Sequence, residues 1–288
     1  MTLFSVTPLN ERDEIDMAVW QAHIEWAHSH GADSVALFGS TGSNGFFAEA
    51  EKIAAFETII PALAGKLPVL AGIGALTTGE AVRMAKRAEA AGADALLAVT
   101  VNYWRPTERE LIAHYAAIAG ATALPLWLYN NPPLAGIDLT PRIVAEIAKV
   151  APTVVGMKDS SGDLKRVFMV PEITGGKVAV GLGQDVLPVE ALMGASPAWF
   201  TGLANFHPAG CSRLWDLAKG GHASETIAQA RALFALSEFG GRYGIVRVAH
   251  TALGLMGKPI RAPRAPLRNL DEAATAELRQ LMAEAGLL

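Results

Sequence analysis

Eight short apolar runs, separated by segments with helical patterns, limit the folds open to this 288-residue chain more than any other feature. Each run is almost continuously apolar, which is typical of strands in a parallel sheet that is covered on both faces. Parallel strands need a crossover segment between them, and a helix usually supplies it. The runs cover residues 3–8, 34–39, 68–74, 95–100, 125–130, 154–158, 177–183 and 197–202.

The segments between the runs begin with residues that favour helix starts. Thr77 is followed three residues later by Glu80, a spacing that allows reciprocal hydrogen bonds at a helix N-terminus. Thr140 precedes Pro141, which predicts a helix whose first residue is a proline. One face of the helix after Thr77 should carry small and apolar side chains, namely those of Ala81, Met84, Ala85, Ala88 and Ala91.

Eight strand–helix units predict a closed (β/α)8 TIM barrel, because closure leaves no exposed edge strand. The alternative is an open doubly wound sheet, but such a sheet usually has a glycine-rich dinucleotide motif after its first strand. Residues 5–13, SVTPLNERD, contain no such motif. After about Lys219 the strand pattern stops and only helical patterns follow. We therefore expect a barrel domain over residues 1–219 and a C-terminal helical extension over residues 220–288.

Composition excludes several functional classes. The 24 Lys and Arg against 28 Asp and Glu give a net charge of −4, which offers no electrostatic basis for binding nucleic acid or an anionic membrane. The single cysteine, Cys211, rules out an intramolecular disulfide or a cysteine-based metal cluster, and the seven histidines show no metal-site spacing. Neither a signal-peptide pattern nor an uncharged apolar run of about 18 residues is present. We expect a cytoplasmic protein that uses no metal or other cofactor.

Lys158 is the unusual residue at the C-terminal ends of the expected strands, where barrel enzymes place their sites. It ends the apolar run VVGMK, so its amine should be partly desolvated. Burial disfavours the charged form, lowers the pKa and makes the amine a nucleophile. Alternatively, the side chain extends to solvent or pairs with Asp159 or Asp185. Its position alone does not decide between these alternatives.

Two other strand ends carry polar groups that could act with Lys158. The turn Ser40-Thr41-Gly42 can present hydroxyls and backbone N–H groups to an anion such as a carboxylate, although it can equally be a structural turn. Tyr129 could transfer protons through its phenol, or it could simply be a packed ring with a bonded hydroxyl. Their convergence on one barrel mouth with Lys158 would indicate a reactive site.

At these positions the chain resembles the dihydrodipicolinate synthase / N-acetylneuraminate lyase family of class I, Schiff-base enzymes. The resemblance covers nearly the whole chain. The matching motifs are GSTG at 39–42, NYWRP at 102–106, YNNP at 129–132 and GMKDSSGD at 156–163. It implies a TIM barrel that binds or releases pyruvate, or another small 2-oxo acid, through an imine.

The resemblance also implies a role for each matching residue. Lys158 would form the Schiff base, and Tyr129 would donate protons to the carbonyl oxygen and the leaving group. Ser40 would bridge Tyr129 to Tyr103, which a neighbouring subunit would contribute, because the family forms homotetramers that are dimers of dimers. Ser40 and Thr41 would hold the pyruvate carboxylate. Two further residues, Gly183 and Phe200, fall where the family lines its pocket.

The second-substrate half of the site departs from both namesakes. Leu134 stands where synthases place an arginine for the carboxylate of aspartate semialdehyde. Val186 stands where sialate lyases have a glutamate, and Ser43 replaces the glutamate that both usually carry after the GSTG turn. The residues near the expected second pocket either line it or pack the barrel against the extension; they are Phe46, Trp104, Pro133, Leu134, Trp199 and Phe200.

These observations predict a Schiff-base-forming lyase or aldolase that cleaves or forms a C–C bond, or dehydrates a 2-oxo acid, with a second substrate less charged than aspartate semialdehyde. One alternative is a 4-hydroxy-tetrahydrodipicolinate synthase, which condenses pyruvate with aspartate semialdehyde. A second alternative is a non-catalytic sensor of 2-oxo acids on the same scaffold.

Overall fold

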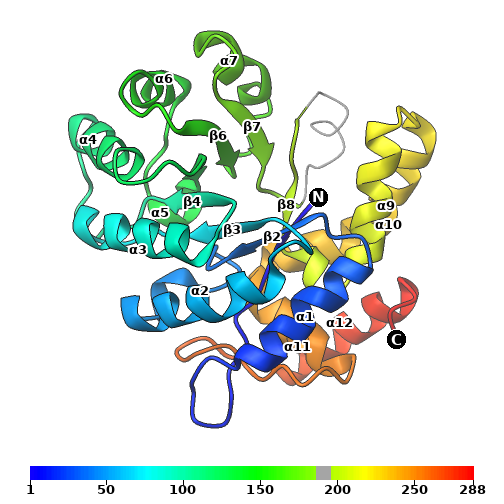
Figure 1. The fold of residues 1–288 in the computed structure, drawn as a ribbon. Helices are drawn as coiled ribbons and strands as arrows, with labels where there is room; N and C mark the ends of the chain where they lie inside the picture. Colours follow the sequence, from blue (N-terminus) through cyan, green and yellow to red (C-terminus); the bar gives the residue numbers. More distant parts are fainter. Residues whose placement is uncertain (186–195) are drawn as a thin grey trace.

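The computed structural model describes residues 1–185 and 196–288, which form a barrel of eight parallel strands surrounded by helices (Figure 1). Neighbouring strands follow the order β7-β6-β5-β4-β3-β2-β1-β8. A parallel bridge between Leu182 and Trp199 joins the two ends of this sheet and closes the barrel. The predicted (β/α)8 architecture is therefore confirmed. The strands are β1 (Thr2–Phe4), β2 (Ser34–Leu37), β3 (Val69–Gly72), β4 (Ala95–Val99), β5 (Leu126–Asn130), β6 (Val154–Asp159), β7 (Ala179–Leu182) and β8 (Phe200–Thr201).

Each apolar run overlaps one strand, and most of the strands are shorter than their runs. The first run was expected to extend to residue 8, but β1 ends at Phe4. There the backbone leaves the sheet because the amide of Asn205 binds it: the Val6 N–H donates to Asn205 Oδ1 at 2.9 Å, and Asn205 Nδ2 donates to the Phe4 carbonyl at 2.8 Å. A side chain 199 residues away in the sequence ends this strand.

The helices of the barrel begin close to the predicted positions. Thr77 Oγ1 accepts from the Glu80 N–H, but among the described hydrogen bonds the Glu80 side chain does not reach back, so only half of that predicted pair forms. Thr140 caps the helix that starts at Pro141, as predicted. The helices are α1 (Met17–Ser29), α2 (Glu49–Leu63), α3 (Thr78–Ala91), α4 (Glu108–Ala119), α5 (Pro132–Ala135), α6 (Pro141–Val150), α7 (Arg166–Ile173) and α9 (Pro208–Lys219), with 3₁₀ turns η1 (Asn44–Phe46) and η2 (Leu203–Asn205).

Three further helices complete the chain, and they pack against one another (Figure 1). They are α10 (Ala223–Tyr243), α11 (Ile245–Leu255) and α12 (Glu272–Glu284). Both α10 and α11 pack against η2, the turn that follows β8. This contact brings the start of α11 and the end of α10 to the mouth of the barrel.

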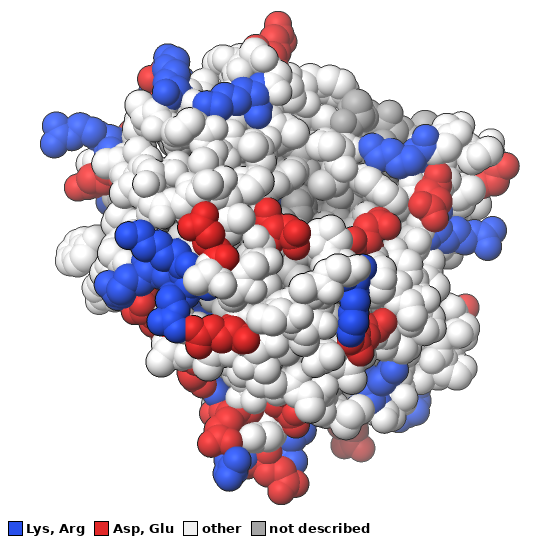
Figure 2. Space-filling view, in the orientation of Figure 1, with Lys and Arg blue, Asp and Glu red and all other residues white. Residues whose placement is uncertain are grey.

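On the face drawn in Figure 2, several Lys and Arg side chains gather at the left beside acidic side chains, and much of the rest of the face is uncharged. Within the described residues, no helix is long and apolar enough to cross a membrane. The same part of the chain contains no group of three or more His, Cys, Asp and Glu side chains arranged to hold a metal ion.

Candidate active site

Lys158 and Tyr129 lie side by side on neighbouring strands at the C-terminal end of the barrel. Tyr129 of β5 is in register with Lys158 of β6, and Asn130 is in register with Asp159. Because side chains alternate along a strand, the first pair shares the inner face and the second pair points outward. The Lys158 Nζ lies 3.7 Å from the centre of the Tyr129 ring.

Asp159 on the outward face is bonded to groups other than Lys158. Its Oδ1 accepts from Asn130 Nδ2 at 2.7 Å and its Oδ2 accepts from Ser161 Oγ at 2.6 Å, while Arg166 Nη1 lies 3.7 Å away. Lys158 forms no ion pair in the described part of the chain and is only 2% exposed. The alternatives of a solvent-exposed lysine, or of one paired with Asp159 or Asp185, therefore do not describe its position.

The surroundings of Lys158 disfavour its charged form. Burial lowers the pKa of the amine, and the nearby Tyr129, Asp185 and Asp159 only partly oppose this effect. Its Nζ donates to Ser160 Oγ at 3.2 Å and lies 4.3 Å from the centre of the Phe4 ring. A lowered pKa leaves more of the amine neutral at a given pH, which is the form that attacks a carbonyl.

The Tyr129 hydroxyl is bonded on two sides. It lies 2.8 Å from Ser40 Oγ and accepts from Asn131 Nδ2 at 2.9 Å. Burial alone would raise the pKa of this phenol, but the positive charge of Lys158 and the hydrogen bonds with Lys158, Ser40 and Asn131 lower it. When Lys158 is protonated, the phenol therefore gives up a proton more easily than an isolated tyrosine does.

The turn after β2 brings Ser40 to this phenol through an unusual backbone. Phe38 adopts a left-handed conformation with φ of 50°, which is rare for a bulky residue. Gly42 passes so close to the residue after β1 that a Cβ there would lie 2.9 Å from the Ser5 carbonyl oxygen. Thr7 Oγ1 donates to the Gly42 carbonyl at 2.9 Å. These contacts fix the turn from which Ser40 and Thr41 face the barrel mouth.

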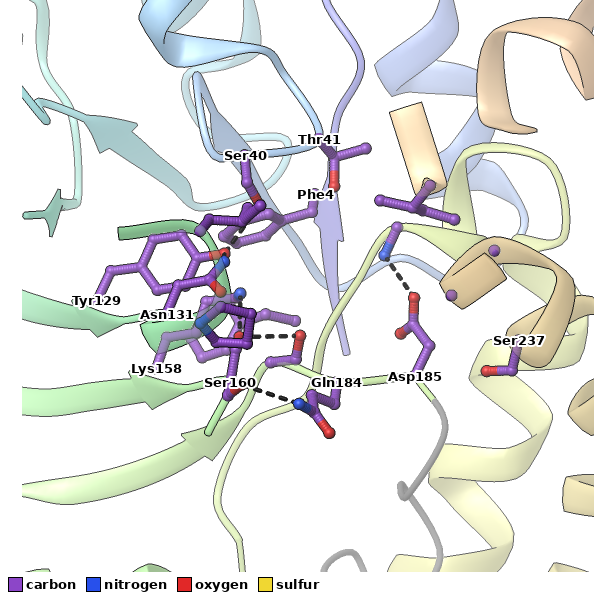
Figure 3. A pocket seen from close by; sticks show the side chains of 18 residues that line it. Phe4, Ser40, Thr41, Tyr129, Asn131, Lys158, Ser160, Gln184, Asp185 and Ser237 are labelled. Carbon is purple, nitrogen blue, oxygen red and sulfur yellow. Dashed lines mark hydrogen bonds between the residues drawn. The ribbon is translucent and has the colours of Figure 1, made fainter. Parts of the chain in front are cut away.

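A cavity of about 370 Å³ opens at the mouth and holds most of the predicted site residues (Figure 3). Tyr103 is not among its lining residues: it lies between β4 and α4, is 87% exposed and packs edge-on against Trp104. Tyr103 therefore makes no part of the site within one chain. The predicted residues that do line the cavity are Ser40, Thr41, Tyr129, Lys158, Gly183, Phe200 and Leu134.

The six residues considered for the second pocket divide into three groups. Pro133, Leu134 and Phe200 line the cavity. Phe46 lines an adjacent cavity of about 310 Å³ that also contacts Ser40, Asn131 and Leu134. Of the others, Trp199 is fully buried and Trp104 is 85% exposed, and neither faces the two cavities. Val186, the position that departs from the sialate lyases, lies outside the described residues.

Two lining residues that were not predicted could have been found from strand alternation. Ser160 and Asn131 each follow a predicted residue by two positions, Lys158 and Tyr129 respectively, and so continue the same inner face. Ser160 Oγ accepts from Lys158 Nζ at 3.2 Å and donates to the Gly183 carbonyl at 3.1 Å. These hydrogen bonds orient the amine toward the cavity.

Asp185, which was considered only as an ion-pair partner, also lines the cavity. Burial raises the pKa of its carboxyl to about 6, although a hydrogen bond with Thr201, the charge of Lys158 and backbone N–H groups oppose the rise. The Gly202 N–H donates to Asp185 Oδ2 at 3.3 Å. Its Oδ1 is buried and has no hydrogen-bond partner among the described residues.

The chain is similar to known proteins over nearly its whole length. Residues 1–285 match the model of the dihydrodipicolinate synthetase family. A protein of Rhizobium meliloti (strain 1021) named 4-hydroxy-tetrahydrodipicolinate synthase is 32% identical over 285 residues, which cover 98% of this chain and 97% of that protein. The protein with that name from Stutzerimonas stutzeri (strain A1501) is 33% identical over 286 residues, with coverage of 98% and 97%.

Solved structures show the same fold. A putative dihydrodipicolinate synthetase from Pseudomonas aeruginosa has a TM-score of 0.95 and 27% identity, and the match covers 99% of this chain and 98% of that one. The chloride-inhibited dihydrodipicolinate synthase from Acinetobacter baumannii, solved in complex with pyruvate, has a TM-score of 0.94 and 30% identity, with coverage of 100% and 98%. Together with the barrel and the family match, these similarities show that the chain belongs to the dihydrodipicolinate synthetase family of pyruvate-dependent class I lyases.

Proposed function

We propose that Lys158 forms an imine with the C2 carbonyl of pyruvate or a longer 2-oxo acid, and that this imine is used to break or form a C–C bond. The observation that carries the proposal is the position of the Lys158 amine: it is buried, unpaired by any described carboxylate, and adjacent to the Tyr129 phenol in a cavity. A lysine with these surroundings is a nucleophile and not a surface charge.

The proposed reaction needs an amine, a proton donor and water. The neutral Lys158 amine attacks C2, the Tyr129 phenol protonates the departing hydroxyl, and water leaves to give the imine. In the protonated form the imine accepts the electron pair of the C3–C4 bond of a 4-hydroxy-2-oxo acid, while the 4-hydroxyl proton passes to the phenolate and an aldehyde leaves. The resulting enamine takes a proton at C3. Water then hydrolyses the imine and releases pyruvate; condensation is the reverse sequence.

Ser40 and Thr41 supply the hydroxyls proposed to hold the substrate carboxylate, since both line the cavity and Ser40 already lies 2.8 Å from the Tyr129 hydroxyl. Besides Tyr129, Ser40 is proposed to bond a second phenol, that of Tyr103 from another copy of the chain. The ring of Tyr103 is 87% exposed in the single chain, which supports a role in contact with another copy. A homotetramer built as a dimer of dimers would provide that contact.

The second substrate, the aldehyde that is released or condensed, is proposed to carry no carboxylate. Lys158 is the only lysine or arginine among the described lining residues, and it is used for the imine. Leu134, at the position of the synthase arginine, is 73% exposed at the cavity rim and cannot bind an anion. A desolvated carboxylate without a cationic or hydrogen-bonding partner is unfavourable. The proposed substrates are therefore 2-oxo acids whose remaining part is uncharged.

The second candidate function is 4-hydroxy-tetrahydrodipicolinate synthase, which the names of the relatives favour. Pyruvate release from a panel of 4-hydroxy-2-oxo acids, compared with condensation of pyruvate and aspartate semialdehyde by the same preparation, separates the two. Release of pyruvate from acids with an uncharged tail, without condensation of pyruvate and aspartate semialdehyde, supports the proposal. Efficient condensation supports the synthase. A protein that traps pyruvate with borohydride yet catalyses neither reaction would be a sensor.

A further inference from the structure

The last turn of α10 contains two adjacent glycines where the helix faces the cavity. Gly240 and Gly241 both line it, together with Ser237 one turn earlier on the same helix. Neither glycine has a positive φ, whereas Gly244 just after the helix does, with φ of 87°. A glycine inside a helix lowers helix stability relative to alanine. Since the backbone at 240 and 241 does not require glycine, the relevant property is the missing side chain.

The space next to Gly240 belongs to the cavity. A Cβ on Gly240 would have one described neighbour within 4 Å, Ile245 Cδ1 at 3.3 Å, and Ile245 lines the cavity as well. A larger side chain at 240 would therefore project beside Ile245 into the cavity. A water molecule takes about 30 Å³ in the liquid, so 370 Å³ holds far more than the three-carbon pyruvate. The α10 end is thus space that pyruvate alone does not use.

Two buried oxygens give this end of the cavity a polar character. Ser237 Oγ and Asp185 Oδ1 have no hydrogen-bond partner among the described residues. Figure 3 shows the Ser237 hydroxyl pointing from α10 toward Asp185. Buried polar groups normally have partners, and an unmet one is costly. A ligand hydroxyl can donate to Asp185 Oδ1 and can accept from Ser237 Oγ, whereas a ligand carboxylate would be repelled by Asp185.

We propose that the α10 end of the cavity, bounded by Gly240, Ile245 and Ser237, is the subsite for the part of the substrate beyond the reacting carbons, and that it selects an uncharged chain carrying a hydroxyl. This inference rests on the proposed imine at Lys158. It assigns substrate selection to a helix outside the eight-stranded barrel. The space beside Gly240 would select for chain length, and Ser237 would select for the hydroxyl.

Competitive borohydride trapping tests the subsite without requiring turnover. The probes are pyruvate, 2-oxohexanoate and 5,6-dihydroxy-2-oxohexanoate, which lack the 4-hydroxyl needed for aldol cleavage and whose reduced adducts differ in mass. We expect wild-type protein to trap the dihydroxy acid in preference to 2-oxohexanoate. Gly240→Val should lower the share of both six-carbon adducts at least tenfold while pyruvate is still trapped. Ser237→Ala should remove the preference between the two six-carbon acids, a change of up to about tenfold for one uncharged hydrogen bond.

A matched control is Gly254→Ala on the neighbouring helix α11, because that glycine is exposed and a Cβ there meets nothing within 4 Å. It should leave all adduct ratios unchanged. Gly240→Ala serves as a second, milder variant if the valine protein does not fold. If pyruvate is trapped but neither Gly240 variant changes the share of the six-carbon acids, the subsite is elsewhere. If wild-type protein traps no 2-oxo acid, the imine proposal itself fails. That result differs from failure of the subsite alone, in which pyruvate is still trapped.

Discussion

Replacing Gly183 by alanine should damage the reactive amine far more than the fold. A Cβ at this position would lie 2.2 Å from Ser160 Oγ, 2.7 Å from Lys158 Nζ and 3.0 Å from the Asp159 carbonyl oxygen. The first two distances are too short, but both atoms are at the ends of side chains that can move. We therefore expect a stability loss near the lower end of the range for overpacking, about 1 kcal/mol. The displaced atoms, however, are the proposed nucleophile and the group that orients it, and misplacement of about 1 Å can cost about 10²-fold in rate.

The assay for Gly183→Ala measures both quantities on the same preparation. Urea denaturation gives the change in the free energy of unfolding, and the rate of borohydride-trapped adduct formation with pyruvate gives the reactivity of the amine. Gly79→Ala is the control, since a Cβ there would meet only Arg83 Nη1 at 3.6 Å. A Gly183→Ala protein that forms the adduct at the wild-type rate would refute the argument that the space beside Nζ is needed. A stability loss of several kcal/mol would refute the argument that side-chain ends absorb the added methyl group.

Further predictions concern the phenol and pH. Tyr129→Phe removes the hydroxyl that bonds Ser40 and Asn131, so turnover should fall by about 10²–10⁴-fold while the affinity for pyruvate, measured by calorimetry, changes little; an equal loss in affinity would assign Tyr129 to binding instead. Because burial lowers the pKa of Lys158, its neutral form should become available at a lower pH than for an exposed lysine, with a reference pKa of about 10.4. The initial rate of adduct formation should therefore rise with pH and reach its midpoint below that value. A midpoint at or above it would contradict the inferred desolvation.

The sequence allowed the barrel to be predicted because burial on both faces makes each strand a continuous apolar run. The sequence could not show where side chains that are distant in the chain end those strands. Strand β1 is shorter than its run because Asn205, distant in the chain, binds the Phe4 carbonyl and the Val6 N–H. The short helix α5 (Pro132–Ala135) was likewise not predicted, because four residues are too few for a helical period to show.

The site was predictable to the extent that strand ends converge at one end of a barrel. Lys158, Tyr129 and Ser40 could be proposed from their positions, and their hydrogen-bonded neighbours Ser160 and Asn131 follow from alternation. The contributions of α10 could not be predicted in this way. Ser237 and Gly240 reach the cavity only because α10 and α11 pack against η2, which is a tertiary contact without a local sequence pattern.

Peptide mapping of the borohydride-reduced pyruvate adduct tests the central claim most directly. Lys52 is a suitable internal comparison, because it is also buried and burial also lowers its pKa, yet it is bonded to Asn44 and the Gly74 carbonyl and does not line the cavity at the barrel mouth. The account predicts a single adduct on the peptide that contains Lys158 and none in Lys158→Ala. An adduct on Lys52, or an undiminished adduct in Lys158→Ala, would contradict it.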